Sequence, residues 1–267
     1  MRPPKNQQST MTKTNSNELS FWEHLDELRS CIVHIFVAVL LCGIVAFCFK
    51  DFVFSIILAP KNADFVTYNL FKVLGASLSD FNIQLINTEL AQQFLVHVKI
   101  SFFVGALVVS PYILFSLFKF VLPALYSSEK RVALKAVVSG YIMFIVGVLL
   151  SYFLIFPLTF RFLGTYQVSE EIVNYISLTS YIATLLTLCL LMGLMFELPI
   201  LCWILARLGF INADFLKTYR RHAIVVICIA AAIITPTADA FTLFVVAVPI
   251  YMLYEISIGI AKRTKRG

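Results

Sequence analysis

Charged residues are scarce in this sequence. Asp, Glu, Lys and Arg together account for 13% of the 267 residues, whereas hydrophobic residues account for 60%. A water-soluble globular protein usually carries about 25% charged residues, and a chain with half that fraction cannot cover its surface with polar groups. The composition therefore excludes an ordinary soluble globule and predicts an integral membrane protein.

Sequence motifs of soluble enzymes and of metal sites are absent as well. The chain contains no G-x-x-x-x-G-K-[ST] phosphate loop, no H-E-x-x-H metal site and no G-x-S-x-G nucleophile turn. Its histidines are not spaced as metal ligands, and its cysteines form no C-x-x-C pair. The first 20 residues lack the apolar core of a cleaved secretory signal. We therefore expect no enzymatic activity, no metal, no cofactor and no disulfide framework.

Six apolar stretches are present, and we interpret each as a membrane span. A bilayer core of about 30 Å requires about 20 apolar residues of helix, and the last two stretches are separated only by a turn-forming segment. The predicted spans are 31–49, 100–122, 136–160, 176–206, 223–234 and 240–260. They make up one membrane domain over 20–260, between a polar tail at 1–19 and a basic tail at 261–267.

The distribution of positive charge predicts how the chain is inserted. Sixteen Lys and Arg residues lie in segments on the N-terminal side of the membrane and five on the other side, mostly in the long loop 50–99. Cytoplasmic segments of membrane proteins carry an excess of Lys and Arg. Both termini are therefore predicted to be cytoplasmic.

The predicted spans are unequal and contain prolines. As helices, 176–206 would be roughly 46 Å long and 223–234 roughly 18 Å, so the second is too short for a normal bilayer core unless the bilayer thins there. Prolines that bend a helix lie inside four spans. They are Pro111, Pro157, Pro199 and Pro249. The predicted fold class is therefore all-α, with six transmembrane helices in a concave, glove-like arrangement.

Acidic residues lead into the first span. Glu23, Asp26 and Glu27 have the i, i+3, i+4 spacing that places side chains on one face of a helix. This face is either a solvated surface, partly neutralised by Arg29, or a site where carboxylates bind guanidinium groups of an incoming basic segment. Glu129, in a basic loop on the same side of the membrane, is either a second such site or a member of a surface ion pair.

Three further acidic residues lie in or beside the later spans. Glu197 precedes Arg207 by ten residues, which places it roughly 15 Å along the helix from the membrane edge. A lipid-exposed carboxylate is costly there, so Glu197 either has a structural polar partner or serves a function. Glu255 can extend to the interface or pair with Lys262. Asp239 is expected to cap the last helix.

Four short motifs follow one another along the chain. The first is FWEHLDELR at 21–29, and the second is FVLPALY at 120–126 with EKR at 129–131. The third is FELP at 196–199, and the fourth is the turn TPTAD at 235–239. In this order they resemble the motifs of the TatC family, the multispanning receptor of the twin-arginine protein translocation system.

The resemblance implies a receptor for the twin-arginine signal peptides of folded precursor proteins. It places Glu27 and Glu129 at the signal-peptide site on the cytoplasmic face. The other residues that it implies at this site are Glu23, Arg29, Phe120, Pro123, Leu125 and Tyr126. It also implies export driven by the proton-motive force across a bacterial cytoplasmic (inner) membrane.

The resemblance further implies partner subunits. Glu197 is expected to contact single-span subunits of the TatA/TatB type, and the short last spans to offer them a docking edge. Pro60, Pro236 and Asp239 are expected to shape the outer loop and turn, and Glu255 to lie at the inner end of the last span. Several copies of the chain are expected in one translocase, and no nucleic acid is expected as a partner.

Other classes of function remain as alternatives. A proton-coupled transporter of small solutes would use Glu197 as its proton relay, although the sequence shows no matching halves or paired broken helices. A membrane-embedded enzyme would need paired catalytic groups at depth. A structural anchor would leave the acidic face before the first span without a role. The receptor is the function that uses all of these residues.

Overall fold

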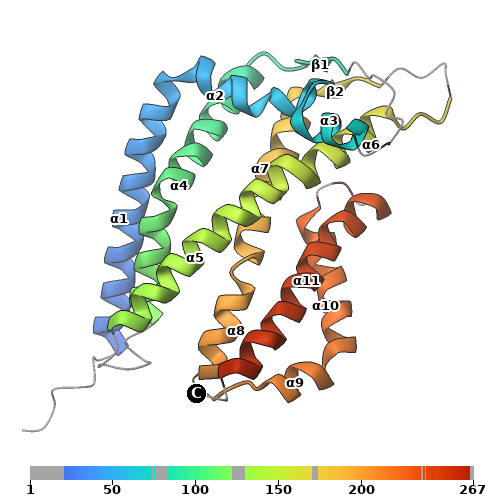
Figure 1. Ribbon diagram of the computed structural model, residues 1–267. Helices are drawn as coiled ribbons and strands as arrows, with labels where there is room; N and C mark the ends of the chain where they lie inside the picture. The colour runs from blue at the N-terminus through green and yellow to red at the C-terminus, as the bar shows by residue number, and fades with distance from the viewer. Residues whose placement is uncertain are drawn as a thin grey trace, which may run out of the picture.

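The computed structural model describes residues 21–73, 75, 83–121, 130–169, 174–207, 209–235, 237 and 239–264. Side chains are described for the same residues except 21–24, 27, 119–121 and 130–134. Long helices make up most of this part of the chain (Figure 1).

Five helical stretches of the described chain are long and apolar enough to cross a membrane. They are Leu28–Cys48, Gln92–Phe118, Lys135–Thr165, Leu178–Arg207 and Ala240–Thr264. The helices that contain them are α1 (Phe21–Cys48), α4 (Gln92–Val121), α5 (Lys130–Leu150) with α6 (Phe156–Thr165), α7 (Leu178–Met195) with α8 (Leu198–Arg207), and α11 (Ala240–Thr264). The prediction of an all-α membrane protein is confirmed.

The stretch predicted as the fifth span forms a short helix. α10 (Arg220–Ile234) has 15 residues, or about 22 Å of helix, and a bilayer core is about 30 Å thick. It packs beside α11, which follows it after the turn (Figure 1). The count of six spans, the orientation and the concave arrangement stay predictions.

Two of the predicted spans are interrupted helices. Between α5 and α6 the chain forms one π-helical turn, η3 (Ser151–Ile155), directly before Pro157. A proline ring has no N–H and clashes with the preceding turn, so π-type turns and kinks gather beside it. The stretch 176–206 begins with two extended residues and is broken between α7 and α8, where Pro199 is the second residue of α8.

Shorter elements connect the long helices at the other end of the bundle from the α4–α5 connection (Figure 1). They are α2 (Lys50–Ile57), η1 (Ala59–Lys61), α3 (Val66–Val73) and the strands β1 (Leu85–Ile86) and β2 (Ile176–Ser177). The two strands pair in parallel, with Leu85 opposite Ile176. The sequence did not predict strands here because a two-residue strand is too short to show an alternating pattern.

Tyrosine hydroxyls attach these connecting elements to the bundle. Tyr181 of α7 donates a 3.0 Å hydrogen bond to the carbonyl oxygen of Ile57, and Tyr152 donates a 2.6 Å bond to that of Ile56. Both carbonyls belong to the last turn of α2, where the helix leaves its carbonyl groups unpaired. Tyr68 of α3 lies 3.1 Å from the carbonyl oxygens of Pro60 and Pro157. Burial raises the pKa of Tyr68 above its usual range, although Arg161 opposes the shift, so the hydroxyl stays a donor.

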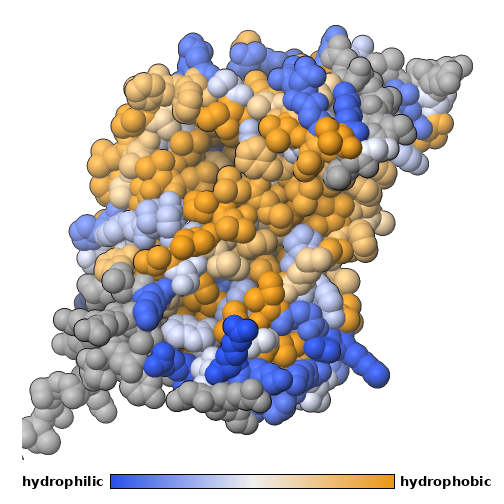
Figure 2. Space-filling model, in the orientation of Figure 1, coloured by the Kyte–Doolittle hydropathy of each residue, from blue (hydrophilic) through white to orange (hydrophobic). Residues whose placement is uncertain are grey.

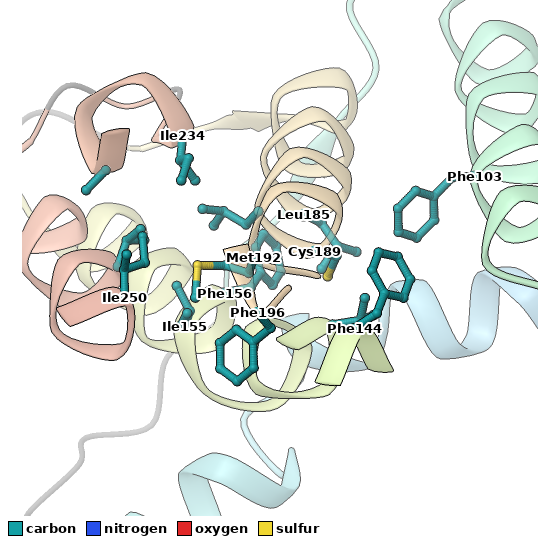
Figure 3. Packing of buried hydrophobic residues seen from close by; sticks show 14 of the residues in the cluster. Phe103, Phe144, Ile155, Phe156, Leu185, Cys189, Met192, Phe196, Ile234 and Ile250 are labelled. Carbon is teal, nitrogen blue, oxygen red and sulfur yellow. The ribbon is translucent and has the colours of Figure 1, made fainter. Parts of the chain in front are cut away.

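α7 is the centre of the apolar core. Its residues Leu185, Cys189 and Met192 are almost fully buried, and Figure 3 shows them between side chains of the neighbouring helices. These neighbours include Phe103 of α4, Phe144 of α5, Phe156 of α6, Ile234 of α10 and Ile250 of α11. α7 therefore packs against helices from both the N-terminal and the C-terminal half of the chain.

Hydrophobic side chains also cover the surface that Figure 2 shows, in a broad region between two hydrophilic ends. α1 illustrates this exposure because large apolar residues such as Phe36, Leu41 and Val45 are exposed. A soluble monomer rarely exposes apolar area on this scale. The distribution matches a chain surrounded by lipid.

The backbones of α1 and α4 touch at two glycines. A Cβ atom at Gly105 would lie 2.6 Å from the carbonyl oxygen of Val39 and 2.7 Å from the backbone nitrogen of Gly43. Small residues permit such close approach between helices in membranes, where lipid leaves little hydrophobic force to drive association. The contact fixes the register of the two helices.

Candidate functional site

Much of the predicted signal-peptide site lies outside the described residues. Pro123, Leu125, Tyr126 and Glu129 all belong to the segment 122–129. For Glu23, Glu27 and Phe120 only the backbone is described, within α1 and α4. The side chains of Asp26 and Arg29 are described, and both are exposed. α1 begins at Phe21, so the three acidic residues of the first motif lie on one helix.

The register of α1 and α4 places the first two motifs near each other. Phe47 stacks on His97, with 3.9 Å between ring centroids, and the two helices meet again at Gly43 with Ser101 and at Val39 with Gly105. Each step of four residues forward in α4 is thus a step of four residues backward in α1. Continued to the ends of the helices, this antiparallel register sets Glu27 level with Leu117 and Glu23 level with Val121.

The second motif follows directly from this end of α4. α4 ends at Val121 and α5 begins at Lys130, so the connection that carries Glu129 starts at the end of α4 that lies level with the acidic turn of α1 (Figure 1). Two segments that are about 100 residues apart in the sequence therefore meet at one end of the bundle.

Glu197 lies at the break between α7 and α8. Its backbone N–H donates to the carbonyl oxygen of Leu194 at 3.1 Å, and its own carbonyl accepts from Ile200 and Leu201 at 3.1 and 3.0 Å. Pro199 cannot donate a backbone hydrogen bond, and its ring disfavours helical geometry in the residue before it. The long helix therefore turns at Glu197 and continues as α8.

The carboxyl group of Glu197 points into the protein. The residue is only 7% exposed, and neither carboxyl oxygen has a hydrogen-bond partner among the described residues. A Cβ atom placed on Gly140 of α5 would lie 3.0 Å from Glu197 Oε2 and 2.9 Å from the Phe118 ring. The carboxyl group thus rests on bare helix backbone beside the last turns of α4. Buried polar groups normally have a partner, so the missing partner marks this carboxyl group as an exception among the described residues.

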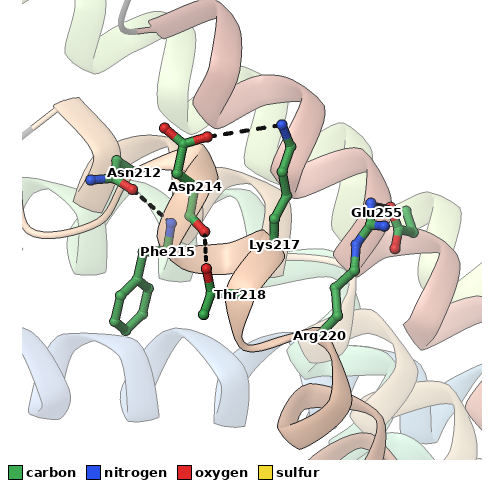
Figure 4. A network of polar contacts seen from close by, with 7 residues as sticks. All are labelled: Asn212, Asp214, Phe215, Lys217, Thr218, Arg220 and Glu255. Atoms are coloured by element: carbon green, nitrogen blue, oxygen red, sulfur yellow. Dashed lines mark hydrogen bonds and ion pairs between the residues drawn. The ribbon is translucent and has the colours of Figure 1, made fainter.

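Glu255 pairs with a residue that the sequence analysis did not select. Its Oε2 accepts a 2.7 Å hydrogen bond from Arg220, at the start of α10, and its Oε1 accepts a 3.1 Å bond from Tyr251. The sequence analysis left Glu255 either extended to the interface or paired with Lys262, which lies two helical turns further along the same helix. The partner in the structure is Arg220, which α9 (Ala213–Thr218) brings to the side of α11 (Figure 4). Asn212, directly before α9, accepts a hydrogen bond from the Phe215 N–H. Within α9, the Thr218 hydroxyl donates to the Asp214 carbonyl oxygen, and the Lys217 ammonium lies 3.9 Å from the Asp214 carboxylate.

The turn between α10 and α11 holds a helix cap. Asp239 Oδ1 accepts a 2.7 Å hydrogen bond from the backbone N–H of Thr242, in the first turn of α11. Partial burial raises the pKa of Asp239, but hydrogen bonds, above all that from the Thr242 N–H, outweigh it and hold the pKa below its usual value. Pro236 lies outside the described residues. Pro60 is buried under α3, where its carbonyl oxygen faces Tyr68.

Within the part of the chain that the structure describes, no cluster of three or more His, Cys, Asp or Glu could hold a metal ion.

A family model described as Sec-independent protein translocase protein (TatC) matches residues 23–249. The chain belongs to the TatC family. The members of this family are components of a protein translocase and not enzymes.

Relatives in the TatC family match nearly the whole chain. The TatC protein of Blattabacterium sp. subsp. Periplaneta americana is 34% identical over 259 residues, which cover 93% of this chain and 97% of the relative. The TatC protein of Aquifex aeolicus is 32% identical over 245 residues, covering 91% of this chain and 95% of the relative. A crystal structure of the twin-arginine translocase receptor TatC superposes with a TM-score of 0.74 at 33% identity, over 91% of this chain and 100% of that one.

The structure also shows residues that the sequence analysis missed. Gly140 and Phe118, which enclose Glu197, were not selected, because nothing in the sequence shows that α4, α5 and the α7–α8 break meet. Arg220 was counted only as one of several basic residues in a loop. A carboxyl group deep in an apolar stretch was the one available signal, and it marked Glu197 but not its neighbours.

Proposed function

We propose that this chain binds twin-arginine signal peptides of folded precursor proteins at the shared end of α1 and α4. The observation that carries the proposal is the antiparallel register, which sets Glu23 and Glu27 level with the last turn of α4. Asp26 and Arg29 are exposed there, and the segment with Glu129 begins at the same place. Two guanidinium groups of a signal peptide would each find a carboxylate.

The same proposal includes the orientation of the chain. Lys and Arg residues gather on the side where the α1–α4 end lies, and five lie on the other side, so the peptide site would face the cytoplasm of a bacterium. α10 would be the fifth of six spans in the inner membrane, where the bilayer thins to meet its 15 residues. Both termini would then be cytoplasmic.

Peptide binding can be measured directly. We would reconstitute the protein in vesicles and titrate it with a fluorescent signal peptide carrying Arg-Arg, and with the same peptide carrying Lys-Lys. A hydrogen bond to a charged group contributes about 1.5 kcal/mol or more, so Glu27→Gln should weaken Arg-Arg binding about tenfold. Asp64→Asn, at an exposed residue of the opposite end, is the matched control. Equal binding by all three proteins would contradict the proposal.

We further propose that single-span TatA/TatB-type subunits dock on α10 and α11. α10 exposes the apolar side chains Val225, Ile229 and Ile233, spaced four residues apart on one face. Its opposite face, with Ile227 and Ile234, is buried against the bundle. The exposed face suits an apolar partner helix. A contact between Glu197 and a partner is a separate proposal, because the Glu197 carboxyl group lies beside Gly140 of α5 and Phe118 of α4.

Cysteine crosslinking along α10 tests the partner surface. Single cysteines at positions 225, 229 and 233 should crosslink to a cysteine in the partner's span, whereas cysteines at the buried positions 227 and 234 should not. The native cysteines would first be replaced, since Cys228 lies on α10 itself and is exposed. Equal crosslinking from both faces, or crosslinking from neither, would place the partner elsewhere on the molecule. Crosslinks between two copies of this chain, looked for in the same experiment, would show whether one translocase contains several copies.

A further inference from the structure

A small cavity opens where α5, α8 and α11 meet, near the basic end of the bundle. Its volume is about 250 Å³, below the range of about 300 Å³ and more that is usual for pockets that enclose a drug-sized ligand. Pro199 and Ile200 of α8 and Ile260 of α11 form apolar walls, and Lys135 and Ser139 of α5 supply polar groups. We call this cavity the basal pocket.

Cations from three helices line the basal pocket or lie within one helical turn of a residue that lines it. Lys135 lines it and is exposed. Trp203 also lines it, and the Arg207 guanidinium carbon stands 5.6 Å from the centroid of the Trp203 ring. Arg263 is exposed and follows Ile260 by three residues on α11, which places it on the same helix face. None of the lining residues is a carboxylate.

The ends of two candidate spans lie at the basal pocket, where lipid headgroups are expected to meet the hydrocarbon core. Lys135 begins one candidate span, and Arg207 ends another. Trp203, one turn before Arg207, has the amphipathic ring that is enriched at membrane interfaces. The walls from Pro199 to Ile200 lie about two turns deeper along α8, within reach of acyl chains. The polar and apolar parts of the pocket thus follow the polar and apolar parts of a lipid.

We propose that the basal pocket binds the headgroup end of an anionic glycerophospholipid. The phosphate would lie between Lys135 and Arg263, and the Ser139 hydroxyl would donate to a glycerol ester oxygen. The first methylene groups of the lipid's acyl chains would contact Pro199, Ile200 and Ile260. Basic pockets between helices are suited to acidic headgroups. A twin-arginine peptide would be repelled by the same cations, so this site is separate from the proposed peptide site.

Trp203 provides a built-in reporter for this lipid. The chain has two tryptophans, Trp22 and Trp203, so a Trp22→Phe protein emits from Trp203 alone. We would reconstitute this protein in vesicles in which either phosphatidylglycerol or phosphatidylcholine carries bromine on the upper acyl chain, at the same overall lipid composition. Brominated phosphatidylglycerol should quench Trp203 at lower mole fraction than brominated phosphatidylcholine. Equal quenching by both lipids would overturn the proposal.

Charge variants localise the preference to the basal pocket. A cation near an anionic lipid surface contributes roughly 1 kcal/mol, so Lys135→Gln and Arg263→Gln should each reduce the relative affinity for phosphatidylglycerol about fivefold. Lys217→Gln, at the same end of the bundle but outside the pocket, is the matched control. A preference that falls equally in the control would be a general surface effect and would contradict the proposal. So would relief of quenching by millimolar glycerol phosphate, since the site would then recognise phosphate without the lipid. The assay contains no signal peptide, so its result is independent of the proposed function.

Discussion

The carboxyl group of Glu197 rests against the backbone of α5 at Gly140. A Cβ atom at Gly140 would lie 3.0 Å from Glu197 Oε2 and 2.9 Å from Phe118 Cε2, both closer than normal contact. Gly140→Ala should therefore push the two side chains apart, and the usual overpacking cost of about 1–3 kcal/mol should offset or exceed the gain of up to about 1 kcal/mol that alanine brings to a helix. Thermal unfolding in detergent would measure the change.

Gly259 supplies the matched control for this substitution. It also lies in a helix, but a Cβ atom there would meet nothing within 4 Å. Gly259→Ala should leave stability unchanged or raise it by up to about 1 kcal/mol, because alanine favours the helix. If the two variants unfold at the same temperature, the tight contact around Glu197 is not present in the protein.

The unpaired carboxyl group of Glu197 should cost stability in the isolated chain. Replacing an unsatisfied buried polar group by an apolar group of similar shape is neutral or favourable, so Glu197→Leu should be as stable as the native protein or more stable by about 1–3 kcal/mol. Co-purification of the same variant with the single-span partner tests separately whether Glu197 contacts that partner. Unfolding and co-purification would be measured together. A Glu197→Leu protein that is clearly less stable would show that the carboxyl group has a partner within the chain.

The Arg220–Glu255 ion pair joins α10 to α11 at a partly exposed position. Its distance is 2.7 Å, and the two side chains are 46% and 34% exposed. Exposed ion pairs typically contribute about 0.2–1 kcal/mol, so a double-mutant cycle with Arg220→Gln and Glu255→Gln should give a coupling free energy in that range. Repeating the cycle at high salt should lower the value. A coupling of zero at low salt would show that the two helices are not held by this pair.

Asp239 caps α11 through the Thr242 N–H. Asp239→Ala should lower the free energy of unfolding by about 0.5–2 kcal/mol, whereas Asp239→Asn, which can still accept the hydrogen bond, should cost less. The pKa of Asp239 is lowered in the folded protein. Its charge-dependent contribution is therefore complete above the unfolded pKa of about 3.9 and is lost as the pH falls through the folded pKa. Unfolding measured from pH 6 down to pH 3 would show this loss in the native protein and not in the Ala variant.

The membrane class and helical fold could be predicted from the sequence because scarce charge and long apolar runs are visible in the sequence itself. The excess length of the fourth stretch and Pro199 indicated a bend in it. The position of the break at Glu197 depends on how α7 and α8 pack. The strand pair at Leu85 and Ile176 could not be predicted, since each strand has two residues. The connecting elements held by Tyr152 and Tyr181 likewise depend on contacts between distant segments.

The candidate site was only partly predictable for a similar reason. Like-spaced carboxylates at Glu23 and Glu27 mark a helix face, but only the antiparallel contact at Gly43 and Gly105 sets that face beside the end of α4. The partner of Glu255 was predicted wrongly because sequence proximity favours Lys262, whereas the turn through α9 delivers Arg220. Local spacing therefore identifies charged faces, and the fold decides which of them meet.

Site-specific photo-crosslinking from positions 27 and 129 tests the central proposal most directly. A precursor with an Arg-Arg signal peptide would be compared with the same precursor carrying Lys-Lys, and a crosslinker at Asp64 would report contacts at the opposite end. We expect arginine-dependent crosslinks from positions 27 and 129 and none from position 64. Crosslinks that do not depend on arginine, or that come only from position 64 in a folded and inserted protein, would contradict a signal-peptide site at the α1–α4 end.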